Sequence, residues 1–473
     1  MNLRKKFRDL RDWCPQPPDR LPNRLKKYSV PIAAIATASI ILSVSFFVFS
    51  LGLMSNMSVP VVPLVNVDSS ANPTLLWNYT TVAEVSSSPV VVNGVVYIGS
   101  ADQNVYAFNA TTGGKLWNYF NDNYEFCTPA VANGMIYVGA LYYVYALNAT
   151  NGDIVWPSAP RLLALMEASP YVSFAFMSPT FEGGVVYCGI NGCDGGGVSA
   201  FDAKTGNTLW ASNFSLGVVY SSPTVANGVV YVSAEGAYPF DFGPTYGVLA
   251  LDAKTGAQLW NYSTGYAAES SPAVAGGVVY AIFYDGSMYA LNATNGQKLW
   301  NYTVGSPKVL APFPNISSGN LDASPTVVDG VVYAASDNGN VYALNSKSGA
   351  KLWSCTTDNG TLSTPAVDDG ILYVGSSDDN IYALNATTGA KLWNYATSGS
   401  VGSAVVVDGI LYVGGGNDVY ALRVSSPSAP SPASHPIWTW AIGIAVVVLI
   451  IAAVAVVLIL KKKSTFGVKN GFA

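Results

Sequence analysis

An eightfold internal repeat between residues 75 and 424 constrains the fold of this chain more than any other feature. Each copy has an apolar stretch that opens with Ser-Pro or Thr-Pro, a second of the type Gly-Val-Val-Tyr, and a third of the type Tyr-Ala-Leu. The prolines stand at positions 89, 129, 179, 223, 272, 325 and 365, with Ala404 in the last copy. Such self-similarity predicts a repeat architecture in which every copy is one supersecondary unit.

The first two stretches of each copy are joined by a pair of turn residues. Examples are Asn93-Gly94, Asp329-Gly330 and Gly276-Gly277. These pairs are typical of two-residue type I′ turns, in which both central residues take a positive φ. The pattern therefore predicts antiparallel β-hairpins and an all-β unit.

A tryptophan marks the fourth stretch, and its positions predict how the repeats close. The first tryptophan precedes any complete copy, and no tryptophan follows the third stretch of the last copy. We expect the strand around Trp77 to complete the blade built from residues 401–422, which leaves no open edge. The chain is thus predicted to be an eight-bladed β-propeller over residues 75–424, and an open solenoid of the same units is the alternative. The tryptophans that we expect to dock between blades are Trp77, Trp117, Trp156, Trp210, Trp260, Trp300, Trp353 and Trp393.

Seven copies contain Asn/Asp-x-x-x-Gly-x-x-x-Trp, as in Asp252, Gly256 and Trp260. The acidic or amide side chain bonds the following backbone, glycine accepts a positive φ, and the indole packs as an apolar plate. The motif resembles the tryptophan-docking repeat of the pyrroloquinoline-quinone (PQQ) dehydrogenase-like propellers. That group also contains the non-enzymatic lipoprotein of the outer-membrane barrel-assembly machinery. The resemblance covers all eight predicted blades and concerns the fold, because the motif is structural in catalytic and non-catalytic members alike.

Loop lengths predict which face of the propeller is functional. From the Ser or Thr of the first stretch to the Tyr of the second, the spacing is nine residues in all eight copies. From each tryptophan to the next Ser or Thr it varies from 10 to 24, and between the second and third stretches from 8 to 18. In an antiparallel blade these two variable connections lie at the same end. We expect this variable face to bind a partner, since rigid scaffolds carry function on their loops.

The four longest insertions on this face are at about 157–177, 188–197, 233–247 and 302–323. Their aromatic side chains are candidates for contact with a protein or a glycan. The alternative is that they fold over the propeller mouth as a lid. These candidate partner-binding residues are Tyr171, Phe174, Phe176, Tyr238, Phe240, Phe242, Tyr246 and Phe313.

Four acidic residues precede first strands near the predicted mouth, namely Glu84, Glu125, Glu269 and Asp322. Converging carboxylates are ligands for Ca²⁺. The resemblance implies that a PQQ enzyme would hold its cofactor over Ca²⁺ at this mouth, with an Asp as base. The adjacent cysteine pair typical of such enzymes is absent from the sequence. We therefore expect no cofactor, and Ca²⁺ or PQQ is the alternative.

Smaller features receive structural interpretations. Aspartates between the second and third strands, such as Asp102 and Asp285, are interpreted as turn formers. Cys188 and Cys193 bracket one hairpin loop and are candidates for a local disulfide in an oxidising exterior. Asn-x-Ser/Thr sequons are confined to the segment between the two apolar stretches described below, and Asn213, Asn315 and Asn359 are candidate glycosylation sites outside the repeat register.

Two charge-free stretches, 29–54 and 437–460, are each long enough for a transmembrane helix. Basic residues in 1–28 and 461–473 place both termini in the cytoplasm by the positive-inside rule. A linker at 55–74 and a Ser/Pro-rich stalk at 425–436 would hold the propeller outside. A cleaved signal peptide is the alternative for the first stretch, although its apolar core is unusually long.

The charge distribution separates the remaining functional classes. Between residues 29 and 460 there are 10 basic and 25 acidic residues, which excludes the dense positive surface that nucleic acids require. The chain has one histidine, His435, so most acid–base and metal constellations are also excluded. We predict a membrane-anchored, non-catalytic cell-surface propeller that binds a protein or glycan. A PQQ-dependent oxidoreductase and an envelope-assembly scaffold are the alternatives.

Overall fold

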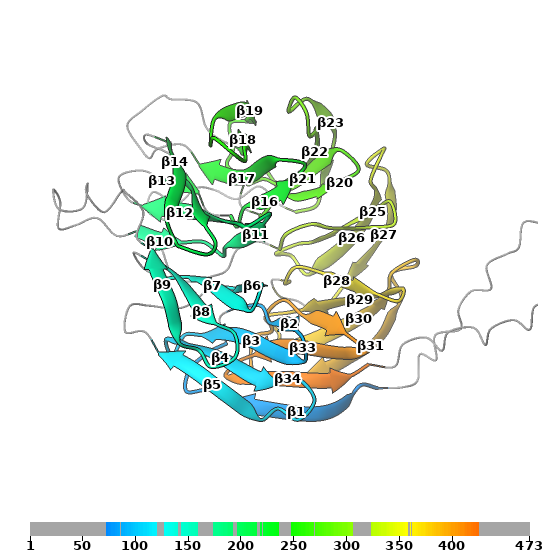
Figure 1. Ribbon diagram of the computed structural model, residues 1–473. Coiled ribbons are helices and arrows are strands. Elements are labelled where there is room, and N and C mark those ends of the chain that lie inside the picture. The colour runs from blue at the N-terminus through cyan, green and yellow to red at the C-terminus, as the bar shows by residue number, and fades with distance from the viewer. Residues whose placement is uncertain are drawn as a thin grey trace, which may run out of the picture. The chain divides into compact units, whose positions relative to one another are not determined.

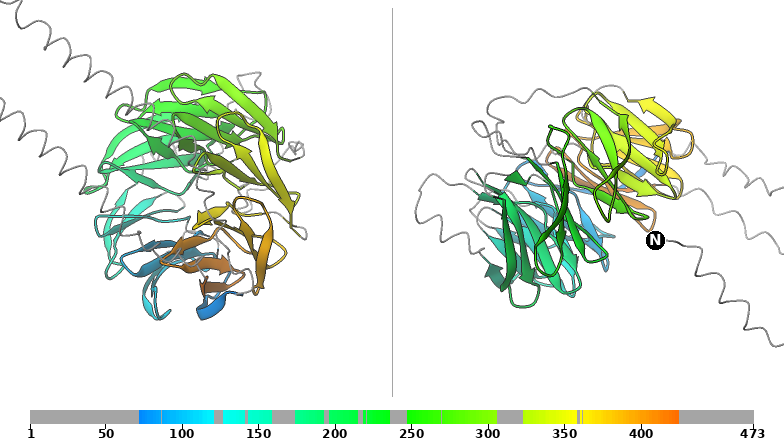
Figure 2. Two further views of the ribbon diagram at one scale, coloured as in Figure 1. Left: turned by 90° about the vertical axis from the view of Figure 1, so that its right-hand side faces the viewer. Right: turned by 90° about the horizontal axis from the view of Figure 1, so that it is seen from above.

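The computed structural model describes residues 72–85, 87–120, 127–140, 143–158, 174–192, 196–214, 218–219, 221–235, 247–268, 270–305, 323–357, 360 and 362–424. These residues form eight antiparallel sheets arranged as the blades of a propeller (Figures 1 and 2). Within these ranges there is no helix long and apolar enough to cross a membrane. The predicted helices at 29–54 and 437–460 lie outside the described residues.

Blades I to IV follow one another along the chain, each running from its inner to its outer strand. Blade I contains β2 (Val90–Val92), β3 (Val95–Ser100), β4 (Asn104–Asn109) and β5 (Lys115–Phe120). Blade II contains β6 (Ala130–Ala132), β7 (Met135–Gly139), β8 (Val144–Asn148) and β9 (Ile154–Ser158). Blade III contains β10 (Phe174–Phe176), β11 (Thr180–Glu182), β12 (Val185–Gly192), β13 (Gly196–Asp202) and β14 (Thr208–Phe214). Blade IV contains β15 (Val218–Val219), β16 (Thr224–Ala226), β17 (Val229–Glu235), β18 (Val248–Asp252) and β19 (Gln258–Tyr262).

Blades V to VIII repeat the same order, and the last one borrows its outer strand from the start of the chain. Blade V contains β20 (Ala273–Ala275), β21 (Val278–Ile282), β22 (Ser287–Asn292) and β23 (Lys298–Thr303). Blade VI contains β24 (Thr326–Val328), β25 (Val331–Ala335), β26 (Asn340–Asn345) and β27 (Lys351–Thr356). Blade VII contains β28 (Ala366–Asp368), β29 (Ile371–Gly375), β30 (Asn380–Asn385) and β31 (Lys391–Ala396). Blade VIII contains β32 (Val405–Val407), β33 (Ile410–Gly415), β34 (Asp418–Arg423) and β1 (Thr74–Thr80).

The ring closes as the sequence predicts. Strand β1 pairs antiparallel with β34, so that Thr74 lies opposite Arg423, Trp77 opposite Ala421 and Thr80 opposite Asp418. The inner strand of each blade lies beside the inner strand of the next, including β2 of blade I beside β32 of blade VIII. Figure 1 shows β1 in blue and β34 in orange side by side at this junction. The open solenoid is therefore excluded.

Type I′ turns join the first two strands of every blade. In blade I, Asn93 and Gly94 have φ values of 51° and 75°, and the pair at the corresponding position of each other blade is also positive in φ. Two residues with positive φ match the right-handed twist of the flanking strands, which fixes the register of each hairpin. The Asn-Gly, Asp-Gly and Gly-Gly pairs thus set the strand pairing locally.

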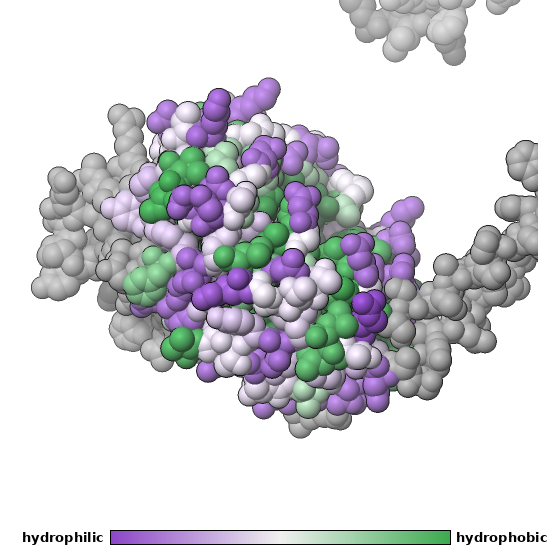
Figure 3. Space-filling model, turned by 60° about the horizontal axis from the view of Figure 1, so that its bottom comes forward, coloured by the Kyte–Doolittle hydropathy of each residue, from purple (hydrophilic) through white to green (hydrophobic). Residues whose placement is uncertain are grey.

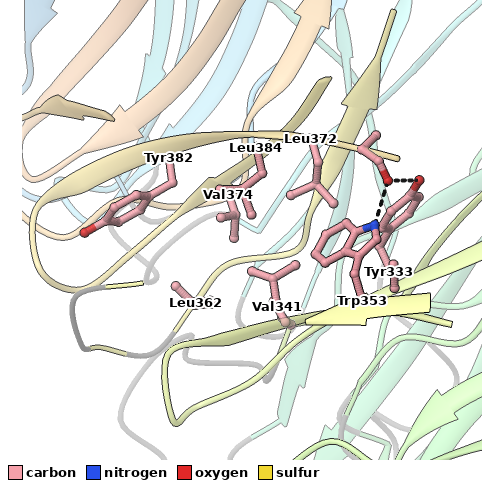
Figure 4. Close-up of a cluster of buried hydrophobic side chains, with 12 residues drawn as sticks. Tyr333, Val341, Trp353, Leu362, Leu372, Val374, Tyr382 and Leu384 are labelled. Carbon is pink, nitrogen blue, oxygen red and sulfur yellow. Dashed lines mark hydrogen bonds between the residues drawn. The ribbon is translucent and has the colours of Figure 1, made fainter. Parts of the chain in front are cut away.

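Each interblade joint is built around one tryptophan. In the joint between blades VI and VII, the Trp353 indole nitrogen donates to the Ala386 carbonyl at 3.0 Å, and the Tyr333 hydroxyl donates to the same oxygen at 3.1 Å (Figure 4). The two rings lie 6.0 Å apart, and the turn glycine Gly389 packs against the indole face. Other joints repeat this arrangement, so the tryptophans have the docking role that we predicted.

The hydrophobic core is divided into eight clusters, and each cluster combines side chains from two neighbouring blades. In the cluster of Figure 4, Val341 of blade VI meets Leu372 and Leu384 of blade VII, all three without solvent exposure. Burying apolar area between blades stabilises the ring at roughly 25 cal/mol per Å² removed from water. The blades therefore hold one another together laterally.

A β-bulge interrupts the outer strand of every blade at the residue before the docking tryptophan. That residue is aliphatic throughout, and in most blades it is about half exposed, as for Leu116 (51%) and Leu352 (53%). Bulges twist an outer strand away from edge-to-edge pairing with another molecule. In the space-filling view, apolar residues are interspersed with polar ones rather than gathered in one area (Figure 3). We call these eight residues the aliphatic rim; they are Leu76, Leu116, Val155, Leu209, Leu259, Leu299, Leu352 and Leu392.

Candidate functional site

The two ends of the blades differ in their connections. At one end, the turn before the third strand meets the segment that enters the first strand, as where the Val82 amide donates to Asp102 Oδ2 at 3.1 Å. At the other end, the turn after the third strand meets the type I′ turn, as where the Ala110 amide donates to the Gly94 carbonyl at 2.9 Å. The first end carries all the connections of variable length, and we call it the variable face. The second is the fixed face.

Charge is segregated between these faces in the described part of the chain. Among the side chains that the structure describes, those with a charge on the variable face are all acidic, whereas the fixed face carries both signs in balance. The described side-chain carboxylates of the variable face are those of Glu84, Asp102, Asp285, Asp337, Asp378, Asp379 and Asp418. The described basic side chains lie at the fixed face, namely Lys115, Lys204, Lys254, Lys298, Lys347, Lys351, Lys391 and Arg423. Opposite these, the acidic side chains of the fixed face are Asp153, Glu182, Asp202, Asp252, Asp329, Asp368, Asp369 and Asp408.

Several carboxylates of the variable face are held in the same geometry. Asp102 accepts hydrogen bonds from the Asn104 amide at 3.1 Å and from the Tyr106 hydroxyl at 2.6 Å. Asp285 accepts from Tyr289 at 2.6 Å in blade V. These bonds close the turn, so the prediction that such aspartates form turns is confirmed for Asp102 and Asp285. Partial burial raises the pKa of Asp102, whereas the hydrogen bonds from Tyr106, Asn104 and Val82 lower it. The hydrogen bonds outweigh burial, so the pKa of Asp102 lies below its ordinary value.

Small hydroxyl side chains line the entry to the inner strands. The amide of Ser271 donates to the Ser324 hydroxyl at 3.0 Å, and the amide of Ser324 donates to the Thr364 hydroxyl at 2.9 Å. Thr364 and Ser403 continue the series. Each hydroxyl thus bridges one blade to the next around the propeller axis. The Ser and Thr of the Ser-Pro and Thr-Pro repeats are these hydroxyl residues. From the sequence alone they were interpreted only as the starts of the inner strands.

A second series of serines lies one residue before the first series in the sequence. The sequence analysis did not predict its role either. Ser270 accepts a hydrogen bond from the Ile282 amide at 2.9 Å, and Ser363 accepts one from the Gly375 amide at 2.9 Å. The spacing of twelve residues recurs for Ser87 and Ser221. These bonds tie the entering segment to the second strand of its own blade, which fixes the start of each inner strand.

Of the four predicted metal ligands, the structure describes Glu84 alone, so their convergence stays a prediction. Glu84 is exposed, whereas Glu125, Glu269 and Asp322 lie outside the described residues. Within the described ranges, no group of three or more His, Cys, Asp or Glu side chains could hold a metal ion.

Most of the predicted binding aromatics also fall in the insertions outside the described residues. Phe174 and Phe176 are in β10, where Phe174 lies opposite Gly192 and Phe176 opposite Ile190 of β12. The insertions therefore lengthen blade III with an additional strand, and β15 does the same in blade IV. The others, outside the described residues, are Tyr171, Tyr238, Phe240, Phe242, Tyr246 and Phe313.

Of the candidate glycosylation sites, Asn213 lies in β14, with its backbone opposite Gly197 of β13. Asn315 and Asn359 lie outside the described residues.

Of the two cysteines in the predicted disulfide, Cys188 is a free cysteine on β12, fully buried in the core between blades II and III. Cys193 lies outside the described residues. The strand directs the Cys188 side chain into the apolar core, where burial raises the pKa of its thiol well above the ordinary value. Cys127 is likewise free, and burial raises the pKa of its thiol to about 11.

The described charges of the variable face are unfavourable for PQQ. The cofactor itself carries carboxylates, and the charged side chains that the structure describes on this face are carboxylates, beside neutral hydroxyl and amide groups. Arg161 and Lys308, the basic residues of the insertions, lie outside the described residues. Like charges repel more strongly as water is excluded from a site. We therefore derive no chemistry from this cofactor.

Eight blades, a closing strand from the N-terminal side and repeated tryptophan docking define a class of propellers that includes both enzymes and binding proteins. The sequence profile of one family in this class matches residues 64–156, 142–317 and 311–428. The chain belongs to this family, which is described as the outer membrane protein assembly factor BamB.

Individual relatives have different activities. The chain is 29% identical over 218 residues to the outer membrane protein assembly factor BamB of Yersinia pestis, covering 44% of this chain and 51% of the relative. It is 26% identical over 210 residues to the tetrathionate hydrolase of Acidithiobacillus ferrooxidans, covering 41% and 39%. It thus spans about half the length, or less, of these curated relatives.

The fold has solved counterparts. The quinohemoprotein alcohol dehydrogenase from Comamonas testosteroni superposes with a TM-score of 0.60 at 19% identity, covering 76% of this chain and 78% of that one. BamB from Moraxella catarrhalis gives a TM-score of 0.58 at 18% identity, covering 75% and 98%. At these identities the likeness shows the fold alone.

Proposed function

We propose that the chain is a non-catalytic, membrane-anchored propeller that binds a basic protein partner through its variable face. The observation that carries the proposal is the segregation of charge, because the described part of the variable face carries carboxylates and no basic side chain. Complementary charge accelerates the encounter with a positively charged partner and disfavours wrong partners. Membership of the family described as an outer membrane protein assembly factor supports a role in holding other proteins.

The carboxylates favour a protein over a neutral glycan as the partner. Asp337 and Asp379 are exposed at the tips of turns, where they are accessible to lysine or arginine side chains. Asp102 and Asp285 are fixed by their tyrosine bonds, so the acidic pattern is partly rigid. A preorganised surface loses less conformational entropy when it binds. The aromatic insertions on the same face would supply the apolar contact area.

The membrane anchors of this proposal are the stretches 29–54 and 437–460. Their length and lack of charge support two spans, and the basic flanks support cytoplasmic termini. The propeller would then lie on the outer side of the membrane. Binding a protein partner there is compatible with a role in envelope assembly.

Photo-crosslinking in native membranes tests the proposal. A p-benzoylphenylalanine residue is placed at Asp337 on the variable face, with a matched chain carrying it at Lys347 on the fixed face of the same blade. We expect a discrete adduct from the first position and none from the second. Adducts from Lys347 alone would contradict the assignment of the binding face.

A charge-reversal pair tests the electrostatic part. Asp379 and Asp369 belong to blade VII, are both exposed and both have positive φ, but they lie on opposite faces. We expect Asp379→Lys to weaken the adduct and Asp369→Lys to leave it unchanged. An enzymatic role would instead appear as dye reduction by the purified full-length chain after addition of PQQ and Ca²⁺.

A further inference from the structure

Both ends of the propeller lie at the fixed face. Strand β1 begins at Thr74, which pairs with Arg423 at the end of β34. At the other end of the same ladder, Thr80 pairs with Asp418 on the variable face. The polypeptide therefore enters and leaves blade VIII at the fixed face, the same end of the blades at which the described basic side chains lie.

The fixed face is suited to lie toward a lipid surface. Its turns are short and constant in length in every blade, so no loop projects from it. Its described charges balance, with eight basic and eight acidic side chains. The half-exposed aliphatic rim begins only two residues into the outer strands, as at Leu116 in β5 and Leu352 in β27.

The variable face is unsuited to that position. Seven described carboxylates on this face are uncompensated by any described basic group. A membrane surface with anionic headgroups has a negative potential, which repels such a face within a Debye length of about 8 Å at physiological ionic strength. The charge distribution and the chain connectivity are independent observations, and both favour an orientation with the fixed face toward the membrane.

We propose that the fixed face is the membrane-proximal side of the propeller and that the variable face points away from the bilayer. The inference rests on the anchored state of the proposed function, and it names the side from which a partner arrives. The segment 425–436 joins the fixed face to the predicted span at 437–460. A chain segment of twelve residues cannot span more than about 43 Å.

Energy transfer from the propeller to the bilayer tests the orientation. The full-length chain, with Cys14, Cys193 and Cys355 replaced by serine, receives one fluorophore at Asp337→Cys or at Lys347→Cys. These positions flank the six residues of β26, which rise about 20 Å in total. The chain is reconstituted into vesicles of phosphatidylcholine and phosphatidylglycerol with an acceptor dye at the headgroups. Because both leaflets carry the acceptor, the comparison does not depend on the sidedness of insertion.

We expect greater transfer from Lys347→Cys than from Asp337→Cys. Equal transfer, or greater transfer from Asp337→Cys, in a chain that floats with the vesicles would overturn the orientation and leave the anchoring intact. A chain that fails to float with the vesicles would overturn the anchoring and, with it, the orientation. Unchanged circular dichroism of both labelled chains shows that the fold is retained.

Discussion

Trp77 and Tyr412 donate hydrogen bonds to one and the same oxygen, the carbonyl of Ala110, at 2.8 and 3.1 Å. Trp77 belongs to the first strand and Tyr412 to the last hairpin, and their rings lie 6.0 Å apart. Blade VIII thus docks on blade I through side chains from both ends of the propeller. The closure of the ring is secured by the same joint that recurs between other blades.

Trp77→Ala is expected to destabilise the full-length chain by about 3–5 kcal/mol, because it removes a buried aromatic side chain and leaves a cavity. Tyr412→Phe removes only the hydroxyl and is expected to cost about 1 kcal/mol. Denaturant unfolding followed by circular dichroism measures both. Equal losses for the two variants would show that Trp77 does not carry the closure.

Gly349→Ala tests whether the tryptophan docks against the turn glycine. An added Cβ at Gly349 would lie 2.6 Å from the Trp300 ring, whereas one at Gly94 meets nothing within 4 Å. Both glycines have positive φ, 69° and 75°, so the backbone strain is matched. Because overpacking costs about 1–3 kcal/mol, we expect Gly349→Ala to be less stable than Gly94→Ala by that amount. Thermal unfolding of the two variants gives the comparison.

Asp418 makes the closing ladder sensitive to acid. Burial raises its pKa, but hydrogen bonds from Ser398, Thr80 and Tyr420 outweigh burial, so the pKa in the folded chain lies below the ordinary 3.8. The ionised Asp418 carboxylate therefore stabilises the fold fully at a pH above its pKa in the unfolded chain. This stabilisation is lost as the pH falls through its lower pKa in the folded chain. Asp418→Asn is expected to cost about 1.5–3 kcal/mol at pH 7.

Unfolding measured from pH 7 down to acid checks this expectation. The difference between the original chain and Asp418→Asn should shrink as the pH falls below 3.8. The matched variant Asp379→Asn, at an exposed turn of the same face, controls for a general change in charge. A constant difference across the acid range would contradict the role of the ionised carboxylate.

The thiols of Cys188, which is buried, and Cys127, which is partly buried, are expected to resist alkylation in the folded chain at pH 8. Burial raises the pKa of both thiols, to about 11 for Cys127, so the reactive thiolate is scarce. Mass spectrometry after iodoacetamide treatment, before and after unfolding, measures this protection. Rapid labelling of Cys188 in the folded chain would contradict its burial.

The periodic features of the fold were predictable because local chemistry fixes them. Asn93-Gly94 requires a type I′ turn, and the displaced Trp77 requires a partner at the other end of the chain. Strand β10 was not predictable, since the Phe174 region carries no repeat signal and pairs only with the extension of β12.

The site was less predictable than the fold. Loop spacing identified the variable face, but the hydroxyl series through Ser271 and Ser324 depends on contacts between blades. Sequence spacing made Cys188 a candidate for a disulfide. Spacing does not show which way a strand directs its side chains, and β12 directs Cys188 into the apolar core. The segregation of charge could have been found from the sequence by assigning each charged residue to a blade end.

The pairing of β1 with β34 delays completion of the structure during biosynthesis. Strand β1 emerges first, yet its partner follows roughly 350 residues later, which at ribosomal rates takes on the order of tens of seconds. Throughout that interval β1, which carries Trp77, lacks its pairing partner β34 while the other blades are synthesised. Protection of this nascent segment from premature association is thus a requirement that the architecture imposes on the cell that makes it.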